Sequence, residues 1–335
     1  MTPIKTMIFA TSLSLLAGGT AIADVAQAVQ DQILPGLSDF ADATLDLADV
    51  AVTDCDVAAI QPAYDRAFDA WLQIGHLRLG PAETAVISIA FWPDKRGTTP
   101  RALAQMIADR DPIAEAAADY AQASAAARGF FALDALLFDE ALSVDEDEPA
   151  MAYRCGLIAT VAADLAAQAD QLDRDWRDGF GQTLTTAGQP ENAVYLAPEE
   201  AMQALYTQLM AGLEFTADQR LGRPLDSFDQ PHPRRAEAWR SARSLPNIRA
   251  SLEGQRALAA ALSDAPIPVT QAAFDAAFAA ADRVVDPGFQ DITDAQAWFR
   301  LDVLRQRVQA VRTAVEAELG AALGVSAGFN SADGD

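Results

Sequence analysis

The apolar residues of this chain repeat with a helical period wherever they repeat at all. Apolar or small residues lie three, four, seven, eight and eleven positions after Tyr64. They are Ala67, Phe68, Trp71, Leu72 and Gly75. Similar stripes run over 161–176 and 304–319, whereas the alternation typical of strands is nearly absent. Only 86–91 (VISIAF) has strand character, and a short buried helix explains it equally well. The sequence therefore predicts an all-α fold.

Turn-forming residues divide the chain into segments. Loops are expected at 143–149 (SVDEDEP), 179–198 and 222–233. The acidic run in the first of them lacks the glycine and the spacing of a calcium loop, so it is predicted to be a solvated turn. A division near residue 190 gives two helical halves, each long enough for its own bundle core. We predict halves over 24–190 and 191–323, and a flexible tail over 324–335.

The first 23 residues have the pattern of a secretory signal peptide. An apolar run from Met7 to Leu16 follows Lys5, and Ala21-Ile22-Ala23 precedes the expected cleavage before Asp24. No other segment reaches about 18 uninterrupted apolar residues, so no transmembrane segment is predicted. A formal charge of −24 makes nucleic acid an improbable partner. We expect a free periplasmic protein.

The two cysteines are predicted to form a disulfide. Cys55 and Cys155 are an even pair in an oxidising compartment, where pairing is favoured over two buried thiols. The chain-entropy model credits a loop of roughly 100 residues with up to about 4.7 kcal/mol.

The stretch 71–97 is dense in polar and aromatic side chains around Gly-Pro and Trp-Pro breaks, which suggests a binding site. His76 is one of only two histidines in the chain. The other, His232, lies between prolines and is expected to be exposed and structural. Zinc is therefore disfavoured, whereas a hard ion such as ferric iron could take carboxylate oxygens.

Asp134 is predicted to lie on a buried helix face. In the segment 128–139 (RGFFALDALLFD) it falls on the same stripe as four apolar residues. These are Phe130, Leu133, Leu137 and Phe138. An unpaired buried carboxylate costs several kcal/mol, so Asp134 needs a partner. A structural salt bridge and a place in a ligand site both remain open.

A second polar segment, 218–245, concentrates arginine. It holds Arg220, Arg223, Arg234, Arg235, Arg240 and Arg243. A helix beginning near Arg234 would place Arg240 and Arg243 one turn apart, with Ser241 and Ser244 paired beside them. Arginine suits bidentate contacts with carboxylates and other oxyanions. The segment is either a receptor for anionic groups or a set of counter-charges for acids of the other half, and both roles can hold.

Several blocks together resemble the imelysin-like family. They are GHLRLGP and FWPDKRG, the RGFFALDALLFD segment, and the stretch from LGRPL to RAEAWRSARSL. The resemblance implies two bundle-like helical halves packed together with a site at their junction, in a bacterial envelope protein. Relatives in that family include iron-regulated proteins, components of iron uptake and a peptidase. The family's metal motif is G-x-H-x-x-E, which falls here on Gly129, Phe131 and Asp134. Because Phe131 cannot bind a metal, the resemblance argues against zinc peptidase activity.

We therefore predict a non-catalytic periplasmic protein that binds a small anionic ligand or an iron chelate and serves iron acquisition. The predicted ligand-binding residues are His76, Arg78, Asp94, Arg128, Asp134, Arg220, Arg240, Ser241, Arg243 and Ser244. His76, Arg78 and Asp94 are expected to face Arg240, Ser241 and Arg243 across the junction of the halves.

Two alternatives remain. One is an imelysin-type metallopeptidase, for which the candidate metal ligands are His76, Glu83 and Asp134. The other is an interaction protein that docks on an envelope transporter component and has no small-molecule ligand. No cofactor is identified: iron stays open, and zinc is disfavoured.

Overall fold

The computed structural model describes residues 25–115, 117–142 and 148–326. Within these ranges every regular element is a helix, and the only β-type pairing is an isolated bridge between Ser227 and Gln230. The all-α prediction is confirmed. The signal peptide, most of the SVDEDEP turn and the end of the predicted tail lie outside the described residues.

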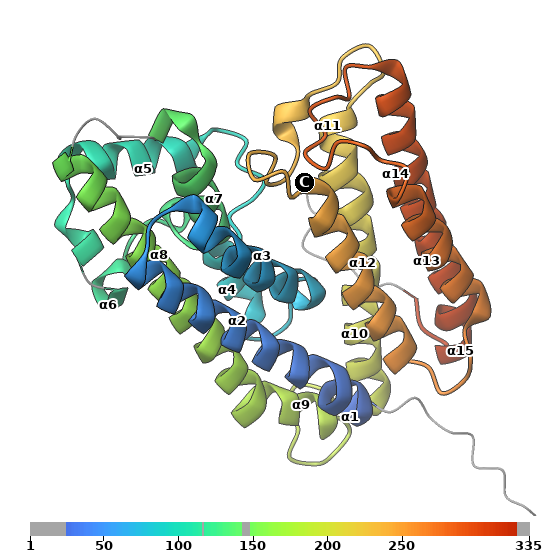
Figure 1. Cartoon of the computed structure of the whole chain (residues 1–335). Helices are drawn as coiled ribbons and strands as arrows, with labels where there is room; N and C mark the ends of the chain where they lie inside the picture. The colour runs from blue at the N-terminus through green and yellow to red at the C-terminus, as the bar shows by residue number, and fades with distance from the viewer. Residues whose placement is uncertain (1–24, 116, 143–147, 327–335) are drawn as a thin grey trace, which may run out of the picture.

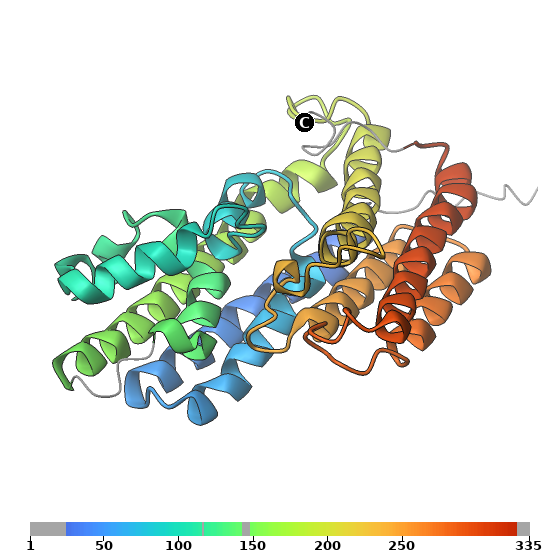
Figure 2. The ribbon, with the colours of Figure 1, turned by 90° about the horizontal axis from the view of Figure 1, so that it is seen from above.

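Figures 1 and 2 show two groups of helices, one formed by α1–α9 and the other by α10–α15. The first group comprises α1 (Val25–Ala28), α2 (Leu34–Thr53), α3 (Val57–Ile74), α4 (Ala82–Ile89), α5 (Thr98–Asp109), α6 (Ala117–Tyr120), α7 (Gly129–Phe138), α8 (Glu148–Asp175) and α9 (Gly181–Thr185). The second comprises α10 (Pro198–Phe215), α11 (Arg223–Leu225), α12 (Ser244–Ala261), α13 (Pro268–Ala281), α14 (Ala295–Val315) and α15 (Ala321–Leu323).

Four π-helical turns join consecutive helices into longer continuous ones. They are Val29–Ile33, Trp176–Phe180, Thr216–Gly222 and Glu316–Gly320. As a result, α8 continues into α9 and α10 into α11. The predicted loops at 179–198 and 222–233 therefore begin several residues too early. Burial of Trp176 and Leu184 outweighs the glycine signals between them, because tertiary packing overrides local propensity.

The predicted apolar stripes form the helix faces that are buried in the core. In α3, Asp56 caps the first turn by accepting a hydrogen bond from the Ala58 N–H, and the stripe from Tyr64 to Leu72 is buried. The stripes of α8 and α14 are likewise buried. The segment 86–91 is largely helical, in α4, but Ile87 is 55% exposed, so this helix is not the buried one expected.

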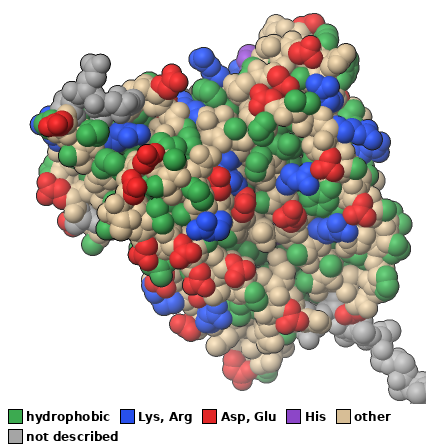
Figure 3. All heavy atoms as spheres, in the orientation of Figure 1, with side chains coloured by type: hydrophobic (Ala, Val, Ile, Leu, Met, Phe, Trp, Pro, Cys, Tyr) green, Lys and Arg blue, Asp and Glu red, His purple; other side chains and the backbone are tan. Residues whose placement is uncertain are grey.

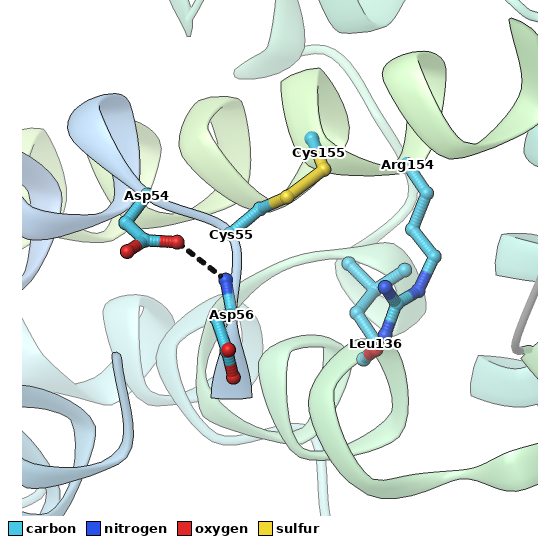
Figure 4. The surroundings of a disulfide bond; sticks show 6 residues. All are labelled: Asp54, Cys55, Asp56, Leu136, Arg154 and Cys155. Atoms are coloured by element: carbon cyan, nitrogen blue, oxygen red, sulfur yellow. Dashed lines mark hydrogen bonds between the residues drawn. A yellow bond between two sulfur atoms is a disulfide. The ribbon is translucent and has the colours of Figure 1, made fainter. Parts of the chain in front are cut away.

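One disulfide fixes the turn between α2 and α3 to α8. Cys55 and Cys155 are bonded, with their Cα atoms 5.3 Å apart, as Figure 4 shows. This confirms the predicted pairing. One position before Cys155 in α8, Arg154 donates a hydrogen bond to the Leu136 carbonyl and so connects α8 to α7.

The helical run 148–185 is, by length and composition alone, apolar enough to cross a membrane. Here it packs against α2 and α7, as the core helix of a helical domain does. The predicted absence of a transmembrane segment stays a prediction. On the face shown in Figure 3, acidic side chains gather over α2, whose exposed side bears Asp39, Asp42, Asp46 and Asp49.

The two groups of helices meet chiefly where α3 packs on α12. Two glycines of the second group make this approach possible. A Cβ on Gly254 would lie 2.0 Å from the Gln73 carbonyl oxygen, and one on Gly212 would lie 2.7 Å from the His76 Cβ. Backbone and side chain of the first group therefore occupy the space that any larger residue would need.

Replacing Gly254 with alanine should separate α3 from α12. Overpacking of a core contact typically costs 1–3 kcal/mol, and the Gln73 backbone cannot rotate away, so we expect Gly254→Ala to lower the free energy of unfolding by about 2 kcal/mol or more. Urea denaturation measures this. The matched control is Gly156→Ala, since Gly156 lies in α8 with open space around its Cα. It should raise the free energy of unfolding by roughly 0.5–1 kcal/mol. Equal effects of the two variants would contradict the close approach.

Candidate functional site

Two cavities lie between the helix groups, and the 71–97 segment contributes to both. The Asp134 cavity has a volume of about 810 Å³ and lies between the α7 region and the arginine segment. Its wall includes Trp92, Asp94, Phe131, Asp134, Asp139, Arg223, Trp239 and Arg240. The His76 cavity, about 740 Å³, lies between the end of α3, α4 and α10. Its wall includes Leu72, His76, Arg78, Glu83, Gln208, Phe215, Arg220 and Ser251.

Asp134 is buried as predicted, on α7, but it forms no ion pair with any residue that the structure describes. Ser241 donates a hydrogen bond to its Oδ1, and the Tyr64 hydroxyl lies 3.5 Å from the same atom. Burial raises the pKa of Asp134 to about 6, although the Ser241 hydrogen bond and the Arg240 charge act in the opposite direction. The predicted alternatives were a salt bridge and a ligand site. The described residues supply no salt bridge to Asp134, and its place in a cavity wall agrees with the second alternative.

The opposite wall of the Asp134 cavity carries arginines that stack on tryptophans. The Arg240 guanidinium lies 4.6 Å from the Trp239 ring centre and also pairs with Asp139 at 2.8 Å. Arg223 lies 5.8 Å from the Trp92 ring centre. Its buried Nε has no hydrogen-bond partner, and no carboxylate of the described residues lies within ion-pair distance of it. Burial, and then the nearby Arg235, lower the pKa of Arg223.

The helix expected to begin near Arg234 is absent. Only a short 3-10 turn, Pro233–Arg235, forms there, and α12 begins at Ser244. Ala238 and Ala242 have φ values of +47° and +56°, which a right-handed helix cannot accommodate. The prediction was wrong because nothing local in these alanines signals a left-handed backbone. The irregular path brings the Ser241 hydroxyl to Asp134.

Four predicted site residues line neither cavity. Ser241 is one of them and donates to Asp134, and the other three have structural partners elsewhere. Arg243 is 5% exposed and pairs with Asp65 at 2.9 Å and with Asp69, both on α3. Arg128 pairs with the buried Asp164. Arg243 therefore neutralises acids of the other half, which is the second role considered for the arginine segment.

Ser244 is the third of these residues. Its hydroxyl donates to the Glu237 carbonyl at 2.7 Å. Asp94, by contrast, lines the Asp134 cavity while accepting hydrogen bonds at the start of α5, including one from the Thr99 N–H at 2.8 Å. Burial acts to raise the pKa of Asp94, but the hydrogen bonds from Thr98, Thr99 and Arg96 outweigh it and lower the pKa.

The expectation that His76 and Arg78 face Arg240, Ser241 and Arg243 is not met. His76 and Arg78 face Gln208, Arg220 and Ser251 across the His76 cavity. Burial, followed by the charges of Arg220 and Arg78, lowers the pKa of His76 to about 3, so its imidazole is neutral at ordinary pH. The single predicted site is thus divided between two cavities. Asp94, Asp134 and Arg240 line one, and His76, Arg78, Glu83 and Arg220 line the other.

The donor set of these cavities does not fit a metal ion. Over the described ranges, no three His, Cys, Asp or Glu side chains are grouped so that they could hold one. Phe131 offers no ligand atom in the Asp134 cavity, and Asp134 accepts hydrogen bonds from Ser241 and Tyr64. Of the candidate ligands, His76 and Glu83 share a cavity that Asp134 does not reach.

Sequence reasoning missed several wall residues. Arg223 was counted in the arginine segment but not placed in a site, and Gln208 and Ser251 carry no local signal. Trp92 and Trp239 stand in the two polar segments that the sequence singled out, and that density of tryptophan beside arginine was the available signal.

Comparison with known proteins identifies related folds. The family model described as Imelysin matches residues 33–321. An imelysin-like protein from Psychrobacter arcticum 273-4 has a similar structure, with a TM-score of 0.75 and 18% identity over 91% of this chain and 96% of that one. A protein described as an iron-regulated protein A precursor, from Parabacteroides distasonis ATCC 8503, has a TM-score of 0.65 and 13% identity over 89% and 97%. A search of curated proteins found no match.

The raised pKa of Asp134 should appear in the pH dependence of stability. The folded protein keeps a proton that the unfolded chain releases near pH 3.8, so this stabilisation is present below pH 3.8 and is lost as the pH rises through about 6. A shift of this size corresponds to up to about 3 kcal/mol. Urea denaturation across this range should show wild type losing more stability than Asp134→Asn. Ser241→Ala removes a hydrogen bond that favours the ionised carboxylate. This variant should therefore be less stable than wild type near neutral pH. Parallel curves for wild type and Asp134→Asn would contradict the assignment.

Proposed function

The chain belongs to the imelysin family, and we propose that it is a non-catalytic periplasmic binding protein of that family, which holds a small anionic ligand in the Asp134 cavity. The ligand we favour is a carboxylate-bearing iron chelate, which links the protein to iron acquisition.

Arg223 is the observation that carries this proposal. The chain has 48 acidic and 24 basic residues, so carboxylates for pairing are abundant. Arg223 nevertheless presents a guanidinium with a buried, unbonded Nε to the cavity and no carboxylate within ion-pair distance among the described residues. Leaving a buried donor unsatisfied costs free energy that a bound oxyanion would restore. The unpaired cation therefore favours an anionic ligand.

The same wall favours a chelate over a bare metal ion. Because the donor set does not fit a metal, iron would have to arrive with its own oxygen ligands. A chelate with outward carboxylates can take bidentate hydrogen bonds from Arg223 and further charge from Arg240. Trp92 and Trp239 hold these two guanidinium groups in place from behind. The Parabacteroides protein is described as an iron-regulated protein A precursor, and this supports an iron-containing ligand.

The location and a partner complete the proposal. The signal-peptide pattern of residues 1–23 would deliver the chain to the periplasm. An envelope transporter component that accepts the chelate is the partner class such a binding protein serves.

Calorimetric titration of the mature chain (24–335) with ferric citrate, citrate and ferric ion tests the proposal. We expect heat from ferric citrate and less or none from ferric ion alone. Arg223→Gln should weaken ferric citrate binding by roughly 10- to 100-fold, the loss of a charge-assisted hydrogen bond. Its thermal stability should not fall, since no carboxylate loses a partner.

Two variants serve as controls for this titration. Arg243→Gln removes a buried ion-paired arginine outside the cavity and should lower stability without a specific loss of affinity. Arg177→Gln removes an exposed arginine from a surface pair with Asp173 and should change neither. Absence of heat from all three ligands would remove the basis of the proposal. Metal-dependent peptide cleavage that is lost in His76→Ala would instead establish the metallopeptidase alternative.

A further inference from the structure

The His76 cavity has the features of a second binding site, which the proposed function does not use. We propose that it binds a small organic anion with a single carboxylate group, held by Arg78 and His76, independently of the Asp134 cavity.

Several polar atoms in and beside this cavity have no hydrogen-bond partner. His76 is 7% exposed, and neither its Nδ1 nor its Nε2 is bonded within the described protein. Ser251, 2% exposed, has an unbonded Oγ in the same wall. Buried polar side-chain atoms are bonded in the large majority of cases. A buried histidine with neither nitrogen bonded within the described protein therefore favours a bound molecule that can hydrogen-bond to it.

The cavity also contains a cation, Arg78, that has no ion-pair partner among the described residues. Arg78 and Arg220 lie on the Phe215 ring, 4.9 Å and 5.0 Å from its centre. Arg220 is neutralised by Glu237 at 2.7 Å, whereas no carboxylate of the described residues is within ion-pair distance of the Arg78 guanidinium. Burial and then the Arg220 charge lower the pKa of Arg78, although the Glu237 charge acts in the opposite direction. One bound carboxylate would supply the missing charge.

The remaining wall selects the kind of anion. Leu72, Leu79 and Val86 form an apolar surface suited to a hydrocarbon or aromatic body. Glu83, Glu214 and Asp218 also line the cavity and would repel a multiply charged anion. Neutral His76 can donate one hydrogen bond and accept another, so it can bond a carboxylate oxygen without adding charge. A monocarboxylate with an apolar body meets all three conditions.

Three aromatic rings separate this cavity from the Asp134 cavity. Phe131 and Trp92, both in the wall of the Asp134 cavity, have ring centres 6.3 Å apart, and Trp92 contacts Phe215 edge to face at 5.9 Å. Phe215 lines the His76 cavity. Ligands on the two sides of these rings do not share a contact residue, so the two sites can be tested separately.

Titration of the mature chain with sodium benzoate, followed by the imidazole proton resonances in NMR, tests the proposal. The chain has only two histidines, so a His232→Gln variant assigns the His76 signals. Benzoate should shift the His76 signals in a saturable way. Arg78→Gln should weaken benzoate binding at least 10-fold while its thermal stability is unchanged or higher, because a buried cation without a partner is removed. Arg223→Gln, in the other cavity, should bind benzoate as wild type does.

The outcomes distinguish this site from the proposed function. If Arg223→Gln loses ferric citrate binding and keeps benzoate binding, two independent sites are supported. If wild type does not bind ferric citrate but does bind benzoate, the proposed function fails and the second site stands. Absence of a His76 shift with benzoate overturns the proposal. Saturable binding of inorganic phosphate in place of benzoate would overturn the carboxylate assignment. A lower thermal stability of Arg78→Gln, together with wild-type benzoate affinity in the same variant, would show that Arg78 is structural.

Discussion

The close contact of the end of α3 with glycines of other helices is the constraint on which the junction of the two helix groups depends. Gln73 lies against Gly254, His76 against Gly212, and Ile74 against Gly36, where a Cβ would lie 2.6 Å from its Cγ2. The Gln73 contact brings backbone to backbone at the junction, and the other two place side chains of the α3 end directly against a glycine. Together they fix where α3 ends. The chain then turns at once toward α4. Because His76 and Arg78 belong to that turn, the position of the His76 cavity follows from helix packing and not from the polar residues themselves.

Charge pairing explains why some arginines hold the halves together while others remain available. Arg243 crosses from the second helix group to Asp65 and Asp69 on α3, and Arg240 crosses to Asp139 beside α7. These pairs neutralise carboxylates at the contact between the two helix groups. Arg78 and Arg223 differ, since each is directed at a cavity with an aromatic ring behind it. Stacking on a ring holds a guanidinium in place without neutralising it.

The sequence was informative where one local pattern decides the outcome. The stripe of α3 and the apolar positions around Asp134 follow from helical periodicity, and the disulfide follows from cysteine count and compartment. The helix predicted near Arg234 fails because left-handed Ala238 and Ala242 are imposed by tertiary contacts. The single predicted site fails for a related reason. Phe215 and Trp92 are far apart in sequence, and only the fold shows that their rings divide the junction in two.

The motif positions illustrate how a family fold can keep a cavity and change what it holds. The resemblance places a metal-binding histidine where this chain has Phe131, and Phe131 stacks on Trp92. Asp134 supplies a carboxyl group at the acidic position of the motif. Burial raises the pKa of Asp134 to about 6, so this group is more readily protonated than an ordinary aspartate. A metal site needs concentrated negative charge and several donors. Here one wall has Phe131 and a carboxyl of raised pKa, while the opposite wall carries stacked arginines, and that combination favours an anion over a cation.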